Sequence, residues 1–267
     1  MKIIVCVKQV PDTSGKVAVN PDGTLNRASM ATITNPDDLN AVEAALTLKD
    51  QMENCEVVVI SMGPPPAEGM LRECIARGAD RAVLVSGREF GGSDTYATSQ
   101  ILAAAINKIG VGPEDIVMCG RQAIDGDNAQ VGPQIAEKLG LPQVSYAANI
   151  QKEGNTLTIQ RMLEDGYMTI KVNTPCLLTC IKELNEPRYM SVGGIFECYS
   201  KPYEILDYEA LKDDPLIDAT TIGLKGSPTN IFKSFTPPQK GAGMMLEGDD
   251  KATCEQLAGI LAAKHII

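Results

Sequence analysis

The first half of the chain alternates short apolar runs with longer amphipathic segments. Four apolar runs are typical of strands that are buried on both faces, at residues 2–10, 56–62, 82–85 and 115–119. Helical spacing and helix start signals predict helices at about residues 36–52, 67–77, from Asp94 to about Ala105, and 129–139. Strands that alternate with helices in this way predict right-handed βαβ crossovers and a parallel sheet. We therefore expect residues 1–145 to form a doubly wound α/β domain.

The pattern changes after residue 145. Between residues 150 and 181, two strand-like runs flank the segment Glu164 to Gly166, which predicts an antiparallel hairpin. Much of residues 190–267 shows too little apolar periodicity to fold alone, which argues for an obligate heterodimer.

The carboxyl-terminal part is expected to be an arm. A stretch rich in Pro and Gly, from Gly226 to Gly241, cannot hold regular structure, and a last helix is expected at about residues 250–264. We predict an α/β nucleotide-binding domain over residues 1–225 and an arm over residues 226–267 that packs on a partner subunit.

The balance of residue types is that of a folded protein in a reducing compartment. Hydrophobic residues make up 44% of the 267 residues and charged residues 22%, which is enough to bury a sizeable core. The net charge of -10 argues against a nucleic-acid partner, because duplex binding needs a surface that neutralises phosphates. No apolar run reaches about 18 residues, so we expect no membrane insertion. The 8 cysteines lie mostly in apolar runs, which favours free thiols and a cytoplasmic location.

Metal binding and hydrolytic chemistry are both disfavoured. The only histidine is His265, near the carboxyl end, and Cys176 and Cys180 are spaced as CxxxC in a strand-like run. Zinc and iron–sulfur sites use clustered Cys and His ligands, and hydrolytic triads hold an internal imidazole against the nucleophile. We therefore predict no metal site and no catalytic histidine.

The usual nucleotide-binding motifs are missing. No GxGxxG follows the first strand, and no GxxxxGK[ST] occurs. Residues 91–95 (GGSDT) resemble the pyrophosphate-binding loop of ATP pyrophosphatases, but Phe90 and Thr95 stand where that loop has serines. The loop also follows the third strand instead of the first. A plain helix N-terminus is the better explanation of this segment.

The strongest local signal is residues 120–133 (GRQAIDGDNAQVGP), between a predicted strand and a predicted helix. Ligands of open α/β sheets bind outside the carboxyl ends of the strands, where this loop must lie. Gly126 permits the close approach of a ligand, and Asn128 with the N–H groups that follow can bind phosphate oxygens at the helix start. A structural turn could use the same Asp and Gly residues, but Arg121 and Gln122 exceed what a turn requires.

These motifs together resemble one family. They are VKQVP at residues 7–11, NP at 35–36, MGP at 62–64, the 120–133 segment, RMLEDG at 161–166 and NEPRY at 185–189. They are similar to motifs of the β subunits of electron-transferring flavoproteins, and the similarity covers the whole chain. The resemblance implies an adenine-nucleotide-hydrolase-like α/β fold with a doubly wound, mostly parallel sheet. It also implies a partner α subunit that carries one FAD in its own mobile domain.

Members of this family divide by the nucleotide that the β subunit holds. One type holds AMP and has a run of Asp residues in the loop, whereas the electron-bifurcating type holds a second FAD. The DGD sequence at residues 125–127 and QVGP at 130–133 resemble the second type. Gly126 lacks a side chain where a ligand longer than AMP would have to pass. The resemblance therefore implies FAD, with AMP as the alternative.

The resemblance also assigns residues to the bound nucleotide. The adenine end would contact Cys6, Asn35, Asp38 and Met62, and the phosphates and ribityl chain would contact Gly120, Arg121, Gln122, Ala123, Asp125, Gly126, Asp127, Asn128, Ala129, Gln130, Val131 and Gly132. Core packing would also explain Cys6 and Met62, because both lie at strand positions. Arg188, Val192 and Ile195 correspond to the segment with which the family recognises its partner.

The function implied by the resemblance is that of a bifurcating β subunit. NADH would give a hydride to the bound FAD, and the electrons would divide between ferredoxin and the α-subunit FAD, which serves a flavin-dependent dehydrogenase of the acyl-CoA or lactate type. The flavin carries this chemistry, so we expect no catalytic side chain and a subunit that is not a complete enzyme alone. The alternative is a subunit that holds AMP as a structural ligand.

Overall fold

The computed structural model describes residues 1–12, 31–229, 241–248 and 250–267. These residues group into two compact units, one made of residues 1–12 and 31–229 and the other of residues 241–248 and 250–267. The second unit contains the helix α8 (Lys251–Ala263), which Asp250 caps by accepting the backbone N–H of Thr253 at 3.0 Å. Within the described residues, no helix has the length and apolar character needed to cross a membrane.

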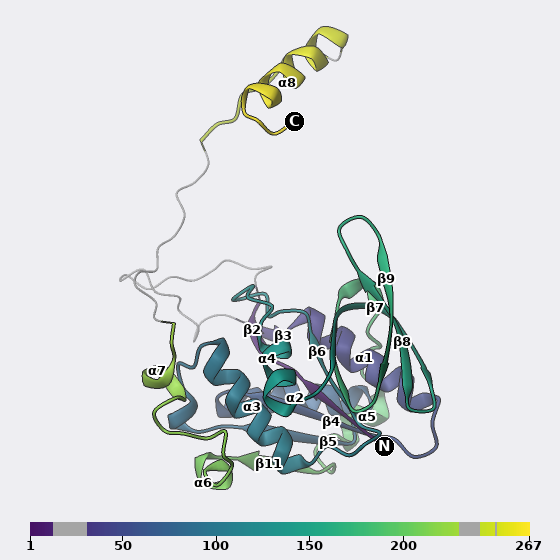
Figure 1. Cartoon of the computed structure of the whole chain (residues 1–267), viewed down its shortest axis with the longest axis vertical. Helices are drawn as coiled ribbons and strands as arrows, with labels where there is room; N and C mark the ends of the chain where they lie inside the picture. The colour runs from purple at the N-terminus through teal and green to yellow at the C-terminus, as the bar shows by residue number, and fades with distance from the viewer. Residues whose placement is uncertain (13–30, 230–240, 249) are drawn as a thin grey trace. The chain divides into compact units, whose positions relative to one another are not determined.

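A large sheet forms the centre of the first unit (Figure 1). Its strands are β1 (Lys2–Cys6), β4 (Glu56–Met62), β5 (Arg81–Val85), β6 (Ile116–Gly120), β7 (Gln143–Glu153), β8 (Thr156–Met162), β9 (Tyr167–Asn173), β10 (Cys176–Cys180) and β11 (Tyr203–Leu206). They lie in the order β11-β5-β4-β1-β6-β10-β7-β8-β9. Pairing is parallel from β11 to β7 and antiparallel from β7 to β9. The predicted mostly parallel α/β fold is confirmed.

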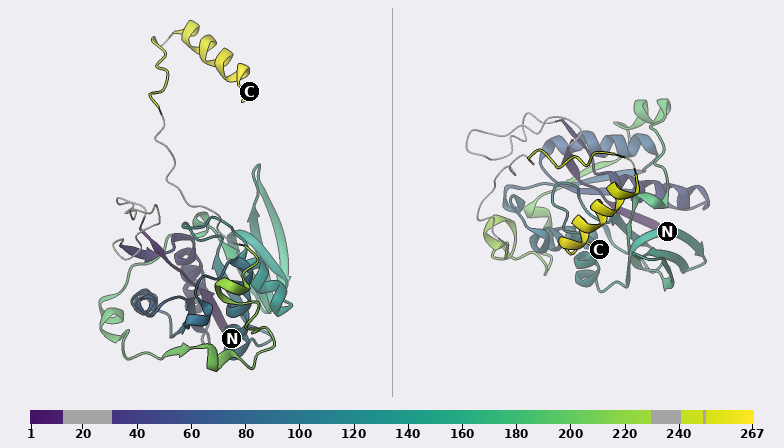
Figure 2. Two further views of the ribbon diagram at one scale, coloured as in Figure 1. Left: turned by 90° about the vertical axis from the view of Figure 1, so that its left-hand side faces the viewer. Right: turned by 90° about the horizontal axis from the view of Figure 1, so that it is seen from above.

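Helices cover both faces of this sheet (Figures 1 and 2). The helices α1 (Pro36–Asp50) and α2 (Glu68–Arg77) pack on one face, and α3 (Thr95–Ile109) and α4 (Val131–Leu139) pack on the other. The strands between them are buried on both sides, which explains why they are continuous apolar runs. The sheet is therefore doubly wound, as the alternation of strands and helices predicted.

The first predicted strand, residues 2–10, is two strands. β1 ends at Cys6, and β2 (Gln9–Pro11) pairs with β3 (Thr32–Thr34) in a separate antiparallel sheet. The chain leaves the large sheet because the backbone N–H of Lys8 donates to a carboxylate oxygen of Asp38 at 2.8 Å. A carboxylate from a different part of the chain ends this strand, so the local pattern of apolar residues could not predict where the strand ends.

Three other predictions need correction. The helix expected from residue 129 begins at Val131. The expected hairpin is β8–β9, but a second hairpin, β7–β8, precedes it, and Figure 2 shows these long strands in teal. The expectation that much of residues 190–267 has too little apolar periodicity to fold alone overlooks residues 203–222, where irregularly spaced side chains pack into the core of the first unit; these are Leu206, Leu211, Ile217 and Ile222.

The remaining short elements connect the main ones. They are the 3-10 turns η2 (Pro65–Ala67), η3 (Arg88–Phe90) and η4 (Lys182–Leu184), and the helices α5 (Val192–Glu197), α6 (Tyr208–Leu211) and α7 (Gly223–Gly226).

Candidate functional site

The chain changes direction across the sheet between β1 and β6, which are neighbours. After β1 the chain adds β4 and β5 on one side, and then returns to place β6 on the other side. A cavity of about 310 Å³ opens at the carboxyl ends of β1 and β6, where residues 6–8 and 119–123 line it. Open α/β sheets bind their ligands at such a switch point. This cavity is therefore the candidate functional site.

Most residues that the sequence analysis assigned to a nucleotide line this cavity. They are Cys6, Asp38, Met62, Gly120, Arg121, Gln122, Ala123, Gly126, Asp127, Asn128, Ala129, Gln130, Val131 and Gly132. Residues 120–132 form one wall, which we call the candidate loop. Asn35 and Asp125 do not line the cavity but hold the candidate loop in place.

The side chains of Asn35 and Asp125 tie the candidate loop to the rest of the domain. The Asn35 amide donates to the carbonyl oxygen of Gln122 at 2.8 Å and accepts the N–H of Ile124 at 3.0 Å. It caps no helix, although Asn35 precedes α1 as a capping residue would. Asp125 pairs with Lys8 at 2.8 Å, but the Lys8 side chain is 48% exposed, so this pair contributes only about 0–1 kcal/mol. The fully buried Asn35 is the stronger constraint on the loop.

Two glycines of the candidate loop are required by close packing. A Cβ at Gly120 would lie 2.4 Å from a carboxylate oxygen of Asp38, and one at Gly132 would lie 2.6 Å from the Cys119 sulfur. Any larger residue would force the neighbouring backbone to move. These glycines therefore bring the first turns of α1 and α4 close to β6, at the floor of the cavity.

Gly126 is different, because space surrounds it. A Cβ there would meet only the Asn128 amide nitrogen, at 3.5 Å, which is an ordinary contact. The neighbouring Asp127 and Ala129 adopt positive φ angles of 51° and 52°, where non-glycine residues are uncommon. This backbone delays the start of α4 to Val131 and shapes the wall of the cavity. The absence of a side chain at Gly126 serves the cavity and not the packing of the loop.

A buried carboxylate lies beneath the candidate loop. Asp38 accepts the backbone N–H groups of Lys8 and Gly120, at 2.8 and 2.9 Å. Burial raises the pKa of Asp38 to about 7 even though these hydrogen bonds favour the charged form. Burial, with a contribution from Asp38, also raises the pKa of the Cys6 thiol to about 12, so Cys6 is protonated at neutral pH. The floor of the cavity therefore offers no thiolate nucleophile at Cys6.

Two cations lie at the rim of the cavity, and each has an acidic partner. Lys8 pairs with Asp125, and the Nε of Arg121 lies 3.3 Å from a carboxylate oxygen of Asp37. Three further acids, Asp38, Asp94 and Asp127, line the cavity, so acidic side chains outnumber basic ones here. The N-termini of α3 and α4 both reach the cavity; a carboxylate caps α3, whereas no side chain caps α4, so the N–H groups at the start of α4 favour an anionic ligand.

Sequence reasoning missed one wall of the cavity. The residues concerned are Val7, Lys8, Ser93, Asp94, Thr95, Thr98 and Leu102. The last five come from the two residues before α3 and from its first half; Asp94 caps this helix by accepting the N–H of Ala97. Thr95 contacts the side chain of Gln130 at 2.9 Å, which joins this wall to the candidate loop. The GGSDT sequence at residues 91–95 is the available signal, but from the sequence it is best explained as an ordinary helix start.

Comparison with known proteins identifies the family. Residues 22–204 match the electron transfer flavoprotein domain. The chain belongs to the family of electron transfer flavoprotein β subunits.

Full-length relatives of this β subunit agree with that assignment. It is 69% identical over 268 residues to the acryloyl-CoA reductase electron transfer subunit gamma of Anaerotignum propionicum, and all of both chains is covered. It is 52% identical over 272 residues to the caffeyl-CoA reductase-Etf complex subunit CarD of Acetobacterium woodii, and 50% identical over 268 residues to the electron transfer flavoprotein subunit beta of Clostridium acetobutylicum, again over all of each chain. The expected family is confirmed, and with it electron transfer as one subunit of an oxidoreductase assembly that involves a flavin or related nucleotide.

The β subunit exposes apolar side chains from the last residue of the NEPRY motif onward. Residues 189–199 include Tyr189, Val192, Phe196 and Tyr199, each more than 70% exposed, and Ile195, which is 48% exposed. We call these residues the apolar segment. Arg188, which the sequence analysis grouped with Val192 and Ile195, binds Glu43 and Asp50 of the same chain. Among the described residues, no cluster of three or more His, Cys, Asp or Glu could hold a metal ion.

Proposed function

We propose that this chain is the β subunit of an electron-bifurcating flavoprotein. It binds FAD in the cavity, accepts a hydride from NADH, and divides the electrons between ferredoxin and the FAD of the α subunit. The observation that carries the proposal is the opening at Gly126, where a side chain would project into the space beyond the candidate loop. A ligand that ended at the adenosine phosphate would not need this opening.

The residues present fit a dinucleotide better than a mononucleotide. The floor at Cys6, Asp38 and Met62 would take the adenine end, and the N–H groups at the start of α4 would take the diphosphate. Beyond them, Thr95 and Thr98 of α3 offer hydroxyl groups, and Leu102 offers an apolar contact, to the part of the ligand that AMP lacks. FAD bound here would supply two-electron exchange with NADH and one-electron exchange with the other acceptors.

The protein side chains have a limited task in this function. The candidate loop, fixed by Asn35, holds the ligand in one position, and the N-terminus of α4 supplies a positive potential for its phosphates. No side chain is required to move a proton in hydride transfer. We therefore assign no catalytic residue, and the chain works only as part of a complex.

The proposed partners are the α subunit, ferredoxin and a flavin-dependent dehydrogenase or reductase in the cytoplasm. Two relatives are named as electron transfer subunits of an acryloyl-CoA reductase and a caffeyl-CoA reductase, which favours an acyl-CoA enzyme over a lactate enzyme. The apolar segment, with Val192 and Ile195, would contact that enzyme, because contiguous exposed apolar side chains are typical of interaction sites. Residues 226–267 would pack on the α subunit; in α8, Leu257 is 47% exposed.

The cofactor inventory of the purified heterodimer tests this proposal. The heterodimer of this chain with its α subunit is denatured, and the released nucleotides are separated and counted. Bifurcation requires two FAD per heterodimer. One FAD and one AMP would refute it and would establish the alternative, in which the β site holds a structural AMP.

A further inference from the structure

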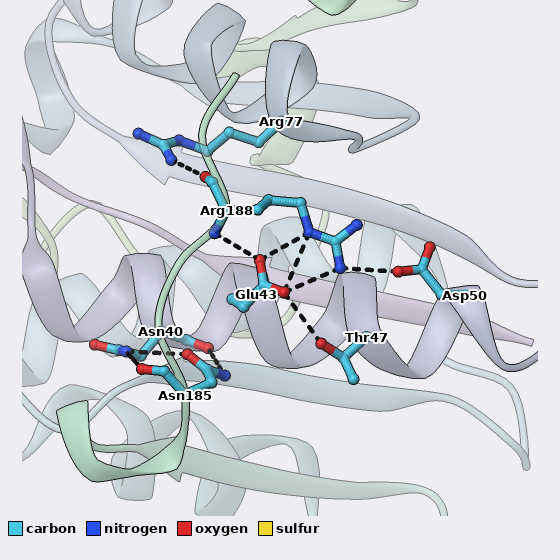
Figure 3. Close-up of polar contacts among 7 residues, drawn as sticks. All are labelled: Asn40, Glu43, Thr47, Asp50, Arg77, Asn185 and Arg188. Carbon is cyan, nitrogen blue, oxygen red and sulfur yellow. Dashed lines mark hydrogen bonds and ion pairs between the residues drawn. The ribbon is translucent and has the colours of Figure 1, made fainter. Parts of the chain in front are cut away.

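The stretch that leads into the apolar segment crosses α1 and is bound to it side chain by side chain (Figure 3). The Asn40 amide donates to the carbonyl oxygen of Asn185 at 2.7 Å, and the Asn185 amide donates to the carbonyl oxygen of Asn40 at 3.0 Å. Three residues later, the backbone N–H of Arg188 donates to Glu43 at 2.9 Å. This stretch, residues 185–188, has no helix or strand of its own. The contacts with α1 therefore take the place of secondary structure.

Glu43 makes the densest set of these contacts. Both its carboxylate oxygens accept from Arg188: the guanidinium Nε lies 2.9 Å from one and a terminal nitrogen lies 2.9 Å from the other. Thr47, one turn further along α1, donates to the same carboxylate at 3.2 Å. Burial alone would raise the pKa of Glu43, but the hydrogen bonds from Arg188 hold it below its usual value.

Glu43 and Asp50, the two acids that Arg188 contacts, differ in how far they are exposed to solvent. Asp50 lies 2.8 Å from the same guanidinium, but its side chain is 60% exposed, whereas that of Glu43 is 11% exposed. An exposed ion pair contributes little, and a half-buried pair with two hydrogen bonds and a backbone N–H contributes more. The two carboxylates on one helix therefore provide a natural comparison.

The apolar segment is also held at its centre. A Cβ at Gly194 would lie 2.2 Å from the carbonyl oxygen of Ala76, so α5 packs directly against the end of α2. The hydroxyl of Ser191 caps α5 by accepting the N–H of Gly194 at 2.9 Å. Tyr189 and Val192 lie between this contact and Arg188, and both are more than 70% exposed. Anchors on two helices thus hold these apolar side chains in exposed positions.

We propose that Glu43 is a positioning residue for partner recognition: by binding Arg188, it fixes the direction in which the apolar segment presents Tyr189 and Val192 to the flavin-dependent enzyme. Glu43 itself is nearly buried, with 11% of its side chain exposed, so it would act through Arg188. The inference rests on the proposed function, which assigns the apolar segment to that enzyme. Pre-organisation strengthens binding because a segment that is already ordered loses less conformational entropy when the complex forms.

Paired substitutions in the heterodimer test the inference. Glu43→Gln and Asp50→Asn each replace a carboxylate by an amide on the same helix and beside the same arginine. The readout is steady-state electron transfer with an acryloyl-CoA reductase of the acyl-CoA dehydrogenase type as the probe enzyme. Glu43→Gln should raise the KM for the heterodimer about tenfold and leave kcat and the nucleotide content within about twofold, since only an encounter-dependent interaction is weakened. Asp50→Asn should change the KM less than about twofold.

A second measurement and two more variants make the result decisive. Amide hydrogen exchange across residues 189–197 should become faster in Glu43→Gln and not in Asp50→Asn. If Glu43→Gln does not assemble with the α subunit, Arg188→Lys serves instead, because it keeps the positive charge and loses the paired geometry. If the KM is unchanged in Glu43→Gln but raised in Val192→Glu, the positioning role of Glu43 is overturned and the proposed partner contact stands. An unchanged KM in Val192→Glu would overturn the proposed partner contact, and the inference with it.

Discussion

The substitution Gly126→Asp should expel the nucleotide from the β subunit. Gly126 lines the cavity, and an added Cβ meets only Asn128 at 3.5 Å, so the new side chain has room to enter the site without disturbing the loop. The carboxylate would then lie beside the space that the proposed diphosphate occupies. The loss of ligand would come from charge and occupied volume and not from unfolding.

The size of the effect follows from the geometry of like charges. Two unit charges about 4 Å apart repel by about 4 kcal/mol at the effective dielectric constant of a partly exposed protein site. A penalty of about 4 kcal/mol weakens binding about a thousandfold. Even a tightly held FAD would be lost during purification of such a variant, whereas the FAD of the α subunit would remain.

The assay counts FAD and AMP per heterodimer after denaturation. Two variants at the same position are the controls. Gly126→Ala adds only the Cβ that the structure accommodates, so it should retain two FAD, and Gly126→Asn adds nearly the volume of Asp without the charge. One FAD in the Asp variant, two in the Ala variant and an intermediate value in the Asn variant are expected. Two FAD in Gly126→Asp would refute our account of this opening.

Three further substitutions test the packing and charge beneath the site. Gly120→Ala places a Cβ 2.4 Å from a carboxylate oxygen of Asp38. The free energy of unfolding should therefore fall by about 1–3 kcal/mol or more, seen as a lower melting temperature of the heterodimer. An unchanged melting temperature would mean that α1 can move to make room for the Cβ. The pKa of Asp38 is about 7 when folded and 3.8 ordinarily, so the folded chain retains a proton that the unfolded chain releases, and stability falls as the pH rises through this range. Urea titrations at about pH 5.5 and 7 should show a loss of about 2 kcal/mol that Asp38→Asn lacks; an equal loss in both proteins would assign it to other groups. Asp94→Ala removes the cap of α3, which accepts from Ala97 at 3.0 Å, and should cost about 1 kcal/mol in the same titration; no change would show that the cap is dispensable.

The three glycines of the candidate loop are present for different structural reasons. The sequence places Gly120, Gly126 and Gly132 in one loop and predicts a close approach of the ligand at Gly126, while the family resemblance assigns all three to the bound nucleotide. The structure separates them: Gly120 and Gly132 are required by neighbouring atoms within 2.9 Å, whereas Gly126 faces open space. Their different roles depend on what lies opposite each one, and a sequence does not state what lies opposite.

The sequence by itself determined the doubly wound sheet, the order of its main helices and the position of the candidate loop, because these follow from local apolar periodicity and from the rule that parallel strands place their carboxyl ends at one edge. Only the tertiary structure decided three features: that β1 ends where Asp38 takes the N–H of Lys8, that the start of α3 forms the far wall of the cavity, and that Arg188 serves Glu43 and Asp50 of its own chain. Each depends on residues that are distant in sequence, 30 positions apart for Lys8 and Asp38 and 145 for Glu43 and Arg188. The chemistry of a side chain can be read from the sequence, but the residue that it contacts depends on the fold.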